Sequence, residues 1–250
     1  MAPGNPVYSS LELSRLHWRG GGVSLLVYRP VGSSAIGAAT RPGRFIMFWY
    51  PGVESIPLAP FPAPGGIGLL VKTRGETTRL LVEKPPRWAG AIGPLGREAQ
   101  LPRGRWLLVA GGTGAAAALQ AAWSTGTGIL VYGVRSAAEA APLQGFIPPG
   151  CSLRYASEDG SIGFHGTVVE AAAELWRSGG FDHVFAAGPP AMLCAIAEVL
   201  PSERLYVSLE AHVRCGLGFC GKCGLGGGEK LLCRDGTVYP WRVARRLLDC

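Results

Sequence analysis

The segment 105–123, RWLLVAGGTGAAAALQAAW, predicts an α/β fold for the middle of the chain. Its first part, RWLLVA, is an apolar run of the kind found in strands that are buried on both faces. Gly111, Gly112 and Gly114 form a turn, after which an alanine-rich stretch has the length of a helix. Since GILVYG (128–133) has the pattern of a second buried strand, strand and helix alternate, which indicates a parallel sheet covered by helices.

The same alternation continues to about residue 205. VVEAAAELWRSG (168–179) predicts a helix that ends at glycine, and FDHVFAAG (181–188) predicts a strand. PPAMLCAIAEVL (189–200) predicts a helix with proline in its first turn. We therefore expect residues 101–205 to form a parallel α/β domain.

The first hundred residues differ from this region because apolar runs alternate with glycine- and proline-rich turns. Four runs predict strands, namely GGVSLLVYRP (21–30), RFIMFWY (44–50), GIGLLVKT (66–73) and TRLLVEK (78–84). Short strands with such turns favour an antiparallel sandwich or barrel. Residues 1–100 are therefore expected to form a β domain.

Four of the seven cysteines lie in the segment 214–235, RCGLGFCGKCGLGGGEKLLCRD. Cys215, Cys220, Cys223 and Cys233 are separated by four, two and nine residues. This spacing is typical of a plant-type [2Fe–2S] site, whereas structural zinc sites usually combine two closely spaced ligand pairs. Zinc and thiols without a ligand remain the alternatives, and a disulfide framework is not expected in a reducing compartment.

Glycine separates the cysteines of this loop. We expect Gly216, Gly218, Gly221 and Gly224 to adopt positive φ angles, because the turns are tight and backbone N–H groups must approach the sulfurs. Residues 206–250 are therefore expected to form a small cluster-binding domain at the C-terminal end.

Composition excludes some other classes of protein. Of 250 residues, 48% are hydrophobic and 16% are charged, which indicates a packed globular protein. The net charge is +7, but no run of Lys and Arg with interleaved aromatic residues points to nucleic acid. No apolar run reaches the roughly 18 to 20 residues of a membrane span, and no secretion leader is recognised, so cytoplasmic residence is the expectation.

The glycine turn after RWLLVA is a weaker signal. Gly112, Gly114 and Ala117 match the pattern G-x-G-x-x-A, in which small residues let a pyrophosphate approach a helix N-terminus. An acidic residue that would hold the ribose is expected about 20 positions later, but Arg135 follows the second strand. A tight turn without any ligand is the alternative.

Together, the segments resemble the ferredoxin-reductase superfamily, and most closely the iron–sulfur flavoproteins that serve as electron-transfer subunits of dihydroorotate dehydrogenase B. The resemblance spans nearly the whole chain. It rests on the segments RPGRFIMFWYPGVESIPLA, VKTRGETTRLL, GAIGPLG, WLLVAGGTGAAAAL, EDGSIGFHGTVVEA, AAGPPAML, SLEAHVRCGLGFCGKC and LLCRDGTVY.

This resemblance implies specific cofactor contacts. Pro57, Leu58 and Ala59 lie on the flavin-lining segment, although Ile56 and Ala59 stand where arginine and serine are usual. The FAD pyrophosphate is expected at three further residues, Lys72, Gly75 and Thr78. The nicotinamide side is expected at five residues, Gly111, Gly112, Gly114, Gly188 and Pro189, with Ala187 in place of the family's cysteine.

The resemblance implies three regions, an FAD-binding β-barrel (1–100), an NAD-binding-like domain (101–205) and a [2Fe–2S] domain (206–250). It further implies an oxidoreductase subunit that passes electrons between NAD(H), FAD and the cluster. The expected partner is an FMN-containing dihydroorotate dehydrogenase catalytic subunit of pyrimidine biosynthesis, in a heterotetramer. No side chain is expected to act as an acid or base.

Two alternatives remain open. One is a reductase subunit that serves a hydrogenase, sulfur or ferredoxin-linked partner, and the other is a zinc-stabilised structural protein without flavin. Residues 224–228 and the basic residues Arg242, Arg245 and Arg246 could form a docking surface or a solvated face.

Overall fold

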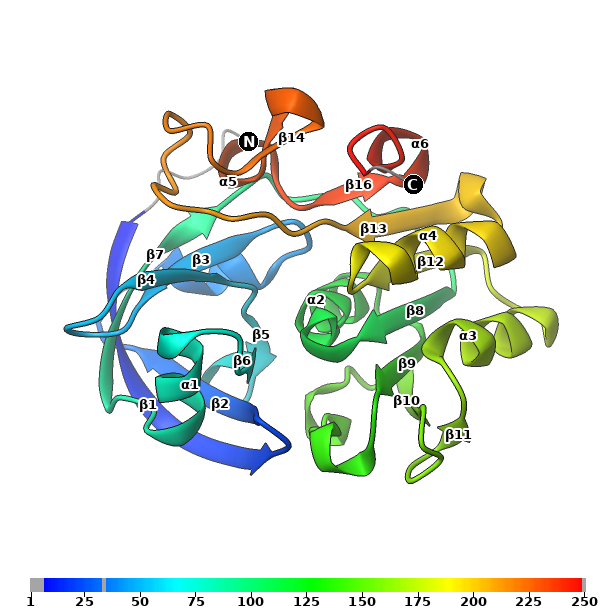
Figure 1. Cartoon of the computed structure of the whole chain (residues 1–250), viewed down its shortest axis with the longest axis horizontal. Helices are drawn as coiled ribbons and strands as arrows, with labels where there is room; N and C mark the ends of the chain where they lie inside the picture. The colour runs from blue at the N-terminus through cyan, green and yellow to red at the C-terminus, as the bar shows by residue number, and fades with distance from the viewer. Residues whose placement is uncertain (1–6, 33–34, 249–250) are drawn as a thin grey trace. The chain divides into compact units, whose positions relative to one another are not determined.

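The computed structural model describes residues 7–32 and 35–248, which divide into two compact units (Figure 1). The first unit is formed by the chain up to Ala99 together with Glu210–Thr237. The second is formed by Gln100–Leu209 and by the chain from Val238 onward. The region 206–250, which was expected to form one C-terminal domain, is thus divided between the two units.

The first unit contains a curled antiparallel sheet (Figure 1). Its strands are β1 (Val7–Gly20), β2 (Val23–Pro30), β3 (Phe45–Trp49), β4 (Ser55–Leu58), β5 (Phe61–Ala63), β6 (Gly66–Lys72) and β7 (Trp88–Leu95), in the order β4-β3-β7-β1-β2-β6-β5. A 3₁₀ helix, η1 (Ala35–Thr40), follows β2. The expected antiparallel sheet is confirmed, although β1, β4, β5 and β7 were not recognised as strands in the sequence.

One face of this sheet forms the core of the unit. Leu26 and Tyr28 of β2 are fully buried there with Ile46 and Phe48 of β3. These residues are spaced by two because successive side chains of a strand point to opposite faces. Met47, between the two core residues of β3, therefore points to the other face, where the cysteine-rich segment lies.

The predicted strand at 78–84 is wrong, because these residues belong to helix α1 (Glu76–Glu83). Its buried residues are Thr77, Leu81 and Val82. Leu81 and Val82 follow Thr77 by four and five positions, a spacing that places all three on one side of a helix. Thr78 stabilises the start of the helix, since its hydroxyl oxygen accepts the amides of Arg74 at 2.8 Å and Gly75 at 2.9 Å. Side-chain capping thus overrides the strand propensity of the apolar run.

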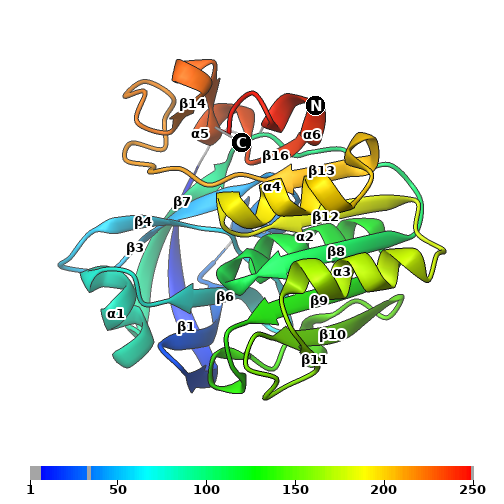
Figure 2. The ribbon, with the colours of Figure 1, turned by 45° about the vertical axis from the view of Figure 1, so that its right-hand side comes forward.

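The second unit is built on a mostly parallel sheet (Figure 2). Its strands are β8 (Trp106–Gly111), β9 (Gly128–Val134), β10 (Cys151–Ser157), β11 (Phe164–His165), β12 (His183–Ala187), β13 (Leu205–Ser208) and β16 (Val238–Pro240), in the order β11-β10-β9-β8-β12-β13-β16. All neighbours are parallel except β16, which pairs antiparallel with β13. The expected parallel α/β sheet is confirmed.

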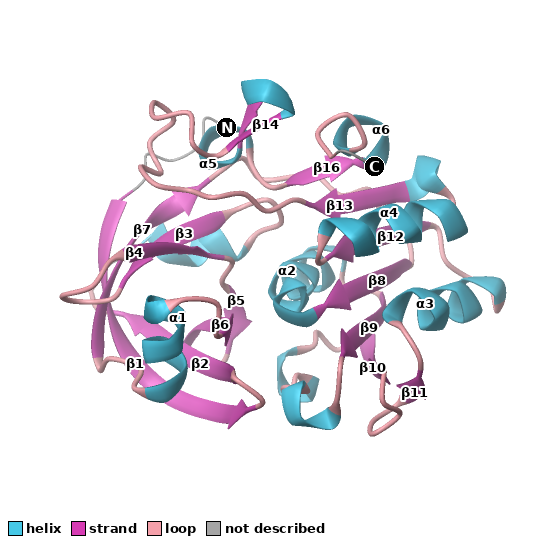
Figure 3. Cartoon of the chain, in the orientation of Figure 1, coloured by secondary structure: helices cyan, strands magenta, loops and turns pink. Residues whose placement is uncertain are grey.

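Helices cover both faces of this sheet (Figures 2 and 3). Helix α2 (Ala115–Thr125) lies on one face, and α3 (Val168–Arg177) and α4 (Pro190–Val199) lie on the other. The short elements are η2 (Gly112–Gly114), η3 (Ala137–Glu139), η4 (Gln144–Phe146), η5 (Ser202–Arg204) and α6 (Trp241–Ala244). The strand order reverses at β8, so the turns after β8 and β12 lie at the position where α/β sheets bind ligands. Among the described residues, no helix has the length and apolar character needed to cross a membrane.

Candidate functional site

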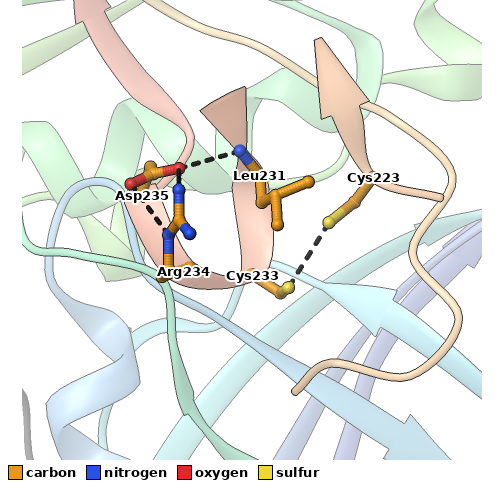
Figure 4. A network of polar contacts seen from close by, with 5 residues as sticks. All are labelled: Cys223, Leu231, Cys233, Arg234 and Asp235. Atoms are coloured by element: carbon orange, nitrogen blue, oxygen red, sulfur yellow. Dashed lines mark hydrogen bonds and ion pairs between the residues drawn. The ribbon is translucent and has the colours of Figure 1, made fainter. Parts of the chain in front are cut away.

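The four clustered cysteines lie in the first unit, around a small hairpin of β14 (Gly224–Leu225) and β15 (Lys230–Leu231) followed by α5 (Leu232–Asp235). The Sγ atoms of Cys223 and Cys233 are 3.4 Å apart (Figure 4). Two thiolates that share one tetrahedral metal at about 2.3 Å would lie about 3.8 Å apart, so this pair fits one metal of a cluster. In the described part of the chain, no three Cys, His, Asp or Glu side chains are gathered around a single ion.

The loop before this pair directs backbone amides at sulfur. The amide of Leu217 donates to Cys215 Sγ at 3.3 Å. Desolvation raises the pKa of the Cys215 thiol, but hydrogen bonds from the Leu217 and Cys220 amides and from the Cys220 side chain outweigh it and lower the pKa to about 6. The loop is therefore prepared to hold an anionic sulfur at Cys215.

Cys233 has the opposite tendency. Desolvation and the neighbouring Cys223 raise the pKa of its thiol to about 12. Two thiolates as close as those of Cys223 and Cys233 repel each other, and a bound cation removes that repulsion. The donor set thus fits a group that brings positive charge to sulfur, as the irons of a [2Fe–2S] cluster do.

Positive φ angles occur at three of the four glycines for which they were expected. Gly216, Gly218 and Gly221 have φ of 68°, 83° and 73°. The expectation was wrong for Gly224, whose φ is not positive. A Cβ at Gly224 would lie 3.0 Å from the Gly221 carbonyl oxygen and 3.1 Å from the Gly228 Cα, so glycine is needed there for close backbone approach.

The cysteine segment packs against the outer face of the curled sheet. The Gly96 amide donates to the Cys233 carbonyl at 2.9 Å, and the Thr237 amide donates to the Gly43 carbonyl at 3.0 Å. A Cβ at Gly216 would lie 3.1 Å from Leu95 and 3.2 Å from Met47. Contacts with the curled sheet therefore help to anchor the segment.

An acidic residue next to Cys233 holds the hairpin in place (Figure 4). Asp235 accepts the Leu231 amide at 2.8 Å and pairs with Arg234 at 3.0 Å. Burial raises the pKa of the Asp235 carboxyl, but Arg234 and the Leu231 amide outweigh burial and lower it. An ionised Asp235 thus fixes the turn that presents Cys233.

The expected flavin segment is an edge of the curled sheet. Pro57 and Leu58 are the last residues of β4, half-buried and paired with Met47 and Ile46 of β3. Ala59 follows directly and is also half-buried. Since β4 is the edge strand, its outer backbone groups have no neighbouring strand, which suits a ligand bound through the backbone.

The expected pyrophosphate residues lie at the start of α1. Lys72 ends β6, Gly75 is the N-cap and Thr78 is the third helical residue. The first amides of a helix have no partner inside it, so they are available to a phosphate. A contact that sequence reasoning missed joins this turn to the flavin edge, because the Thr77 hydroxyl donates to the Glu54 carboxylate at 2.5 Å, just before β4.

In the second unit, the two expected nicotinamide turns pack against each other. A Cβ at Gly114 would lie 2.2 Å from the Ala187 carbonyl oxygen, and one at Gly111 would lie 2.7 Å from Met192 Sδ. A Cβ at Gly188 would lie 2.5 Å from Met192 Cε, the end of a flexible side chain, whereas the close neighbours of Gly114 are backbone atoms. Pro189 is the N-cap residue of α4. The two turns thus meet at the carboxyl ends of β8 and β12.

Gly112 differs from these glycines. Its φ is 54° and nothing lies within 4 Å of a Cβ position, so it faces open space. Gly112 therefore marks the side of the turn that a ligand can approach.

Sequence reasoning found no acidic residue for the ribose, but the structure places Glu139 beside Arg135, directly after β9. Arg135 Nε and Nη2 both donate to Glu139 Oε1, at 3.0 and 2.5 Å. The 3₁₀ turn η3 brings the two side chains together. In the sequence, the only signal for this ion pair is the i, i+4 spacing of two opposite charges.

The remaining expected features lie elsewhere. Arg242, Arg245 and Arg246 belong to the second unit, whereas the cysteine segment belongs to the first. Cys151 is a free thiol, Cys194 is disulfide-bonded, and Cys250 lies outside the described residues. The cysteine loop itself carries two exposed apolar side chains, Leu217 (61% exposed) and Phe219 (77%), which sequence reasoning did not single out.

No protein-family model matches the chain. A protein of Pyrococcus abyssi named probable dihydroorotate dehydrogenase B (NAD(+)), electron transfer subunit, is 34% identical over 203 residues, which are 79% of this chain and 78% of the relative. The chain belongs to this family of electron transfer subunits. A protein of Archaeoglobus fulgidus with the same name is 33% identical over 221 residues, 83% of this chain and 91% of the relative.

Solved structures agree with the fold. An NADH-dependent reduced ferredoxin-NADP oxidoreductase, described for flavin-based electron bifurcation, is 27% identical, with a TM-score of 0.77 over 93% of this chain and 88% of that chain. The ferredoxin reductase of carbazole 1,9a-dioxygenase is 17% identical, with a TM-score of 0.64 over 81% of this chain and 69% of that chain. The fold is therefore ferredoxin-reductase-like.

Proposed function

We propose that the chain carries electrons between NAD(H), FAD and a [2Fe–2S] cluster, to or from an FMN-containing dihydroorotate dehydrogenase catalytic subunit in pyrimidine biosynthesis. The shared name of its relatives supports the dehydrogenase, the use of NAD(+) and the role of electron transfer subunit. The observation that carries the cluster is the close Cys223–Cys233 pair beside a loop whose amides are directed at Cys215. Heterotetrameric assembly and cytoplasmic residence are part of this proposal.

Bound FAD would exchange two electrons with the nicotinamide and single electrons with the cluster. The protein's residues position these groups and set their charge environment. Cys215, Cys220, Cys223 and Cys233 would ligate the irons, and the amide of Leu217 would stabilise the negative charge on sulfur.

The remaining cofactor contacts are proposed at the residues that the family resemblance implies. Pro57, Leu58 and Ala59 would line the flavin along the β4 edge, while Lys72, Gly75 and Thr78 would hold its pyrophosphate at α1. The nicotinamide would be held by the turns after β8 and β12, at Gly111, Gly112, Gly114, Gly188 and Pro189.

In functional terms, residues 1–100 would be an FAD-binding β-barrel and residues 101–205 the nicotinamide-binding domain. The cluster-binding function of the region 206–250 would reside in 210–237, the part that packs with the curled sheet. This arrangement would keep the cluster and the flavin on one unit.

The test is the composition of protein purified without oxygen. We expect FAD, two irons and two inorganic sulfides per chain, an electron paramagnetic resonance signal of a reduced [2Fe–2S] cluster, and bleaching of flavin absorption by NADH. Colourless protein that contains zinc in place of iron and flavin would contradict the proposal and favour the zinc-stabilised alternative.

A second candidate is a reductase subunit for a different acceptor. It is favoured by the 27% identity to an NADH-dependent reduced ferredoxin-NADP oxidoreductase. Affinity purification from the native cell separates the two. An FMN-containing subunit that oxidises dihydroorotate supports the first candidate, whereas copurification with another redox protein refutes the pyrimidine assignment and leaves electron transfer intact.

A further inference from the structure

Arg135 and Glu139 form an ion pair at the carboxyl end of β9. Figure 2 shows that β9 lies next to β8, the strand that carries the glycine turn. Arg135 directly follows β9 and is 69% exposed, whereas the Glu139 side chain is only 10% exposed. Two guanidinium nitrogens of Arg135 donate to one carboxylate oxygen of Glu139. The arginine is therefore held on the surface by a nearly buried carboxylate.

The loop after β10 adds negative charge to the same edge. The Glu158 and Asp159 amides donate to the carbonyls of Val134 and Arg135, at 3.3 and 3.2 Å, which places both acidic residues beside the end of β9. The Glu158 carboxylate interacts electrostatically with Arg135. The edge thus has three acidic residues, Glu139, Glu158 and Asp159, near a single arginine, Arg135.

The amides of this edge are also engaged. The Ala137 amide donates to Ser161 Oγ at 2.7 Å, and the Ser161 hydroxyl donates to Asp159 Oδ1 at 2.5 Å. The Glu158 and Asp159 amides are engaged as described above. None of these donors is available to hold a phosphate.

We propose that Glu139 is a specificity-determining residue that makes the protein select NADH over NADPH, by engaging Arg135 and keeping the edge acidic. This inference rests on the proposed nicotinamide site. In dinucleotide-binding folds, the strand after the glycine turn ends near the ribose of the adenosine half, where an acidic residue favours the 2′-hydroxyl and an arginine accommodates the 2′-phosphate. Here the arginine is present but already paired.

Charge explains the direction of the selection. NADPH differs from NADH by a 2′-phosphate that carries about −1.5 to −2 charges at pH 7. In wild type the charges of Glu139 and Arg135 largely cancel at a bound phosphate. If Glu139 were neutral, a doubly charged phosphate about 6 Å from the freed guanidinium in a water-like dielectric would gain about tenfold in affinity. A ribose 2′-hydroxyl is neutral and can donate a hydrogen bond to a carboxylate.

The test compares Glu139→Gln, Glu139→Gln combined with Arg135→Gln, and the control Glu198→Gln in the FAD-loaded protein. Glu198 is exposed near the end of α4, so its substitution removes the same charge away from this edge. The dissociation constants of NADH and NADPH and the rates of flavin reduction by each are measured by anaerobic stopped flow.

We expect the wild-type protein to prefer NADH, and Glu139→Gln to bind NADPH about tenfold more tightly with little change for NADH. The gain in Glu139→Gln comes from Arg135, which is freed from its ion pair, so the double variant without this arginine should lose the gain. Glu198→Gln should resemble wild type. Wild-type preference for NADPH, no gain in Glu139→Gln, or a gain that survives in the double variant would overturn the inference. If neither nucleotide reduced the flavin of wild-type protein, the proposed function itself would fail at its nicotinamide step.

Discussion

Replacement of Gly114 by alanine tests the packing of the two glycine turns in the second unit. The added Cβ would lie 2.2 Å from the Ala187 carbonyl oxygen, 2.5 Å from its carbon and 2.9 Å from the Gly188 amide nitrogen. Non-bonded carbon contacts are optimal at about 3.5 to 4.0 Å, so one turn must move by more than about 1 Å. All three neighbours are backbone atoms, which cannot rotate away.

The expected cost follows from two opposing effects. Overpacking of this kind costs about 3 kcal/mol when backbone must move. Gly114 has right-handed helical angles (φ −56°, ψ −18°), so alanine regains about 1 kcal/mol by restricting the unfolded chain. We therefore expect Gly114→Ala to lower the free energy of unfolding by about 2 kcal/mol, which corresponds to about 5 °C in melting temperature.

Differential scanning calorimetry measures this effect, and Gly145→Ala is the matched control. Gly145 also lies in a short 3₁₀ turn of the second unit, has no positive φ and has nothing within 4 Å of a Cβ. Its substitution should change stability by less than about 0.5 kcal/mol. FAD content should stay unchanged in both variants, while Gly114→Ala should slow flavin reduction by NADH. Equal melting temperatures for the two variants would refute the packing argument.

Three further predictions concern other parts of the chain. Cys220→Ser should lose iron and the cluster signal, whereas Cys151→Ser should keep two irons per chain; full iron content in Cys220→Ser would exclude it as a ligand. Phe219 is exposed in this chain and is expected to become buried as an aromatic anchor in the interface with the catalytic subunit, so Phe219→Ala should weaken binding of that subunit by about tenfold. Unchanged affinity, or an equal loss in the exposed control Val199→Ala, would exclude the role of Phe219 as an anchor. The amide and the hydroxyl of Thr167 donate hydrogen bonds to the Glu170 carboxylate and lower its pKa. The contact therefore stabilises α3 at pH values above the ordinary glutamate pKa, and this stabilisation is lost as pH falls through the lowered pKa. Thr167→Ala keeps the amide donor and removes the hydroxyl donor, so it should raise the Glu170 pKa part of the way toward its ordinary range in an NMR titration, and an unchanged pKa would contradict the role of the hydroxyl.

Local patterns predicted much of the second unit. The buried strands β8, β9 and β12 and the helices α2, α3 and α4 were recognised because each combines an apolar run with glycine or proline at its ends. The first unit was harder. β1 was missed because its exposed outer face makes the strand look polar, and α1 was taken for a strand because its first-turn capping by Thr78 carries little signal in an apolar run.

The sequence by itself determined which residues can carry the chemistry. The spacing of the four cysteines and the two glycine turns are local properties, so chain order alone reveals them. Tertiary structure decided how these segments are used. It packed the cysteine segment on the curled sheet, joined Glu54 to Thr77 across 23 residues, and set an acidic loop from β10 beside the arginine after β9. These pairings depend on strand order and on close backbone approach between distant segments, which no local pattern encodes.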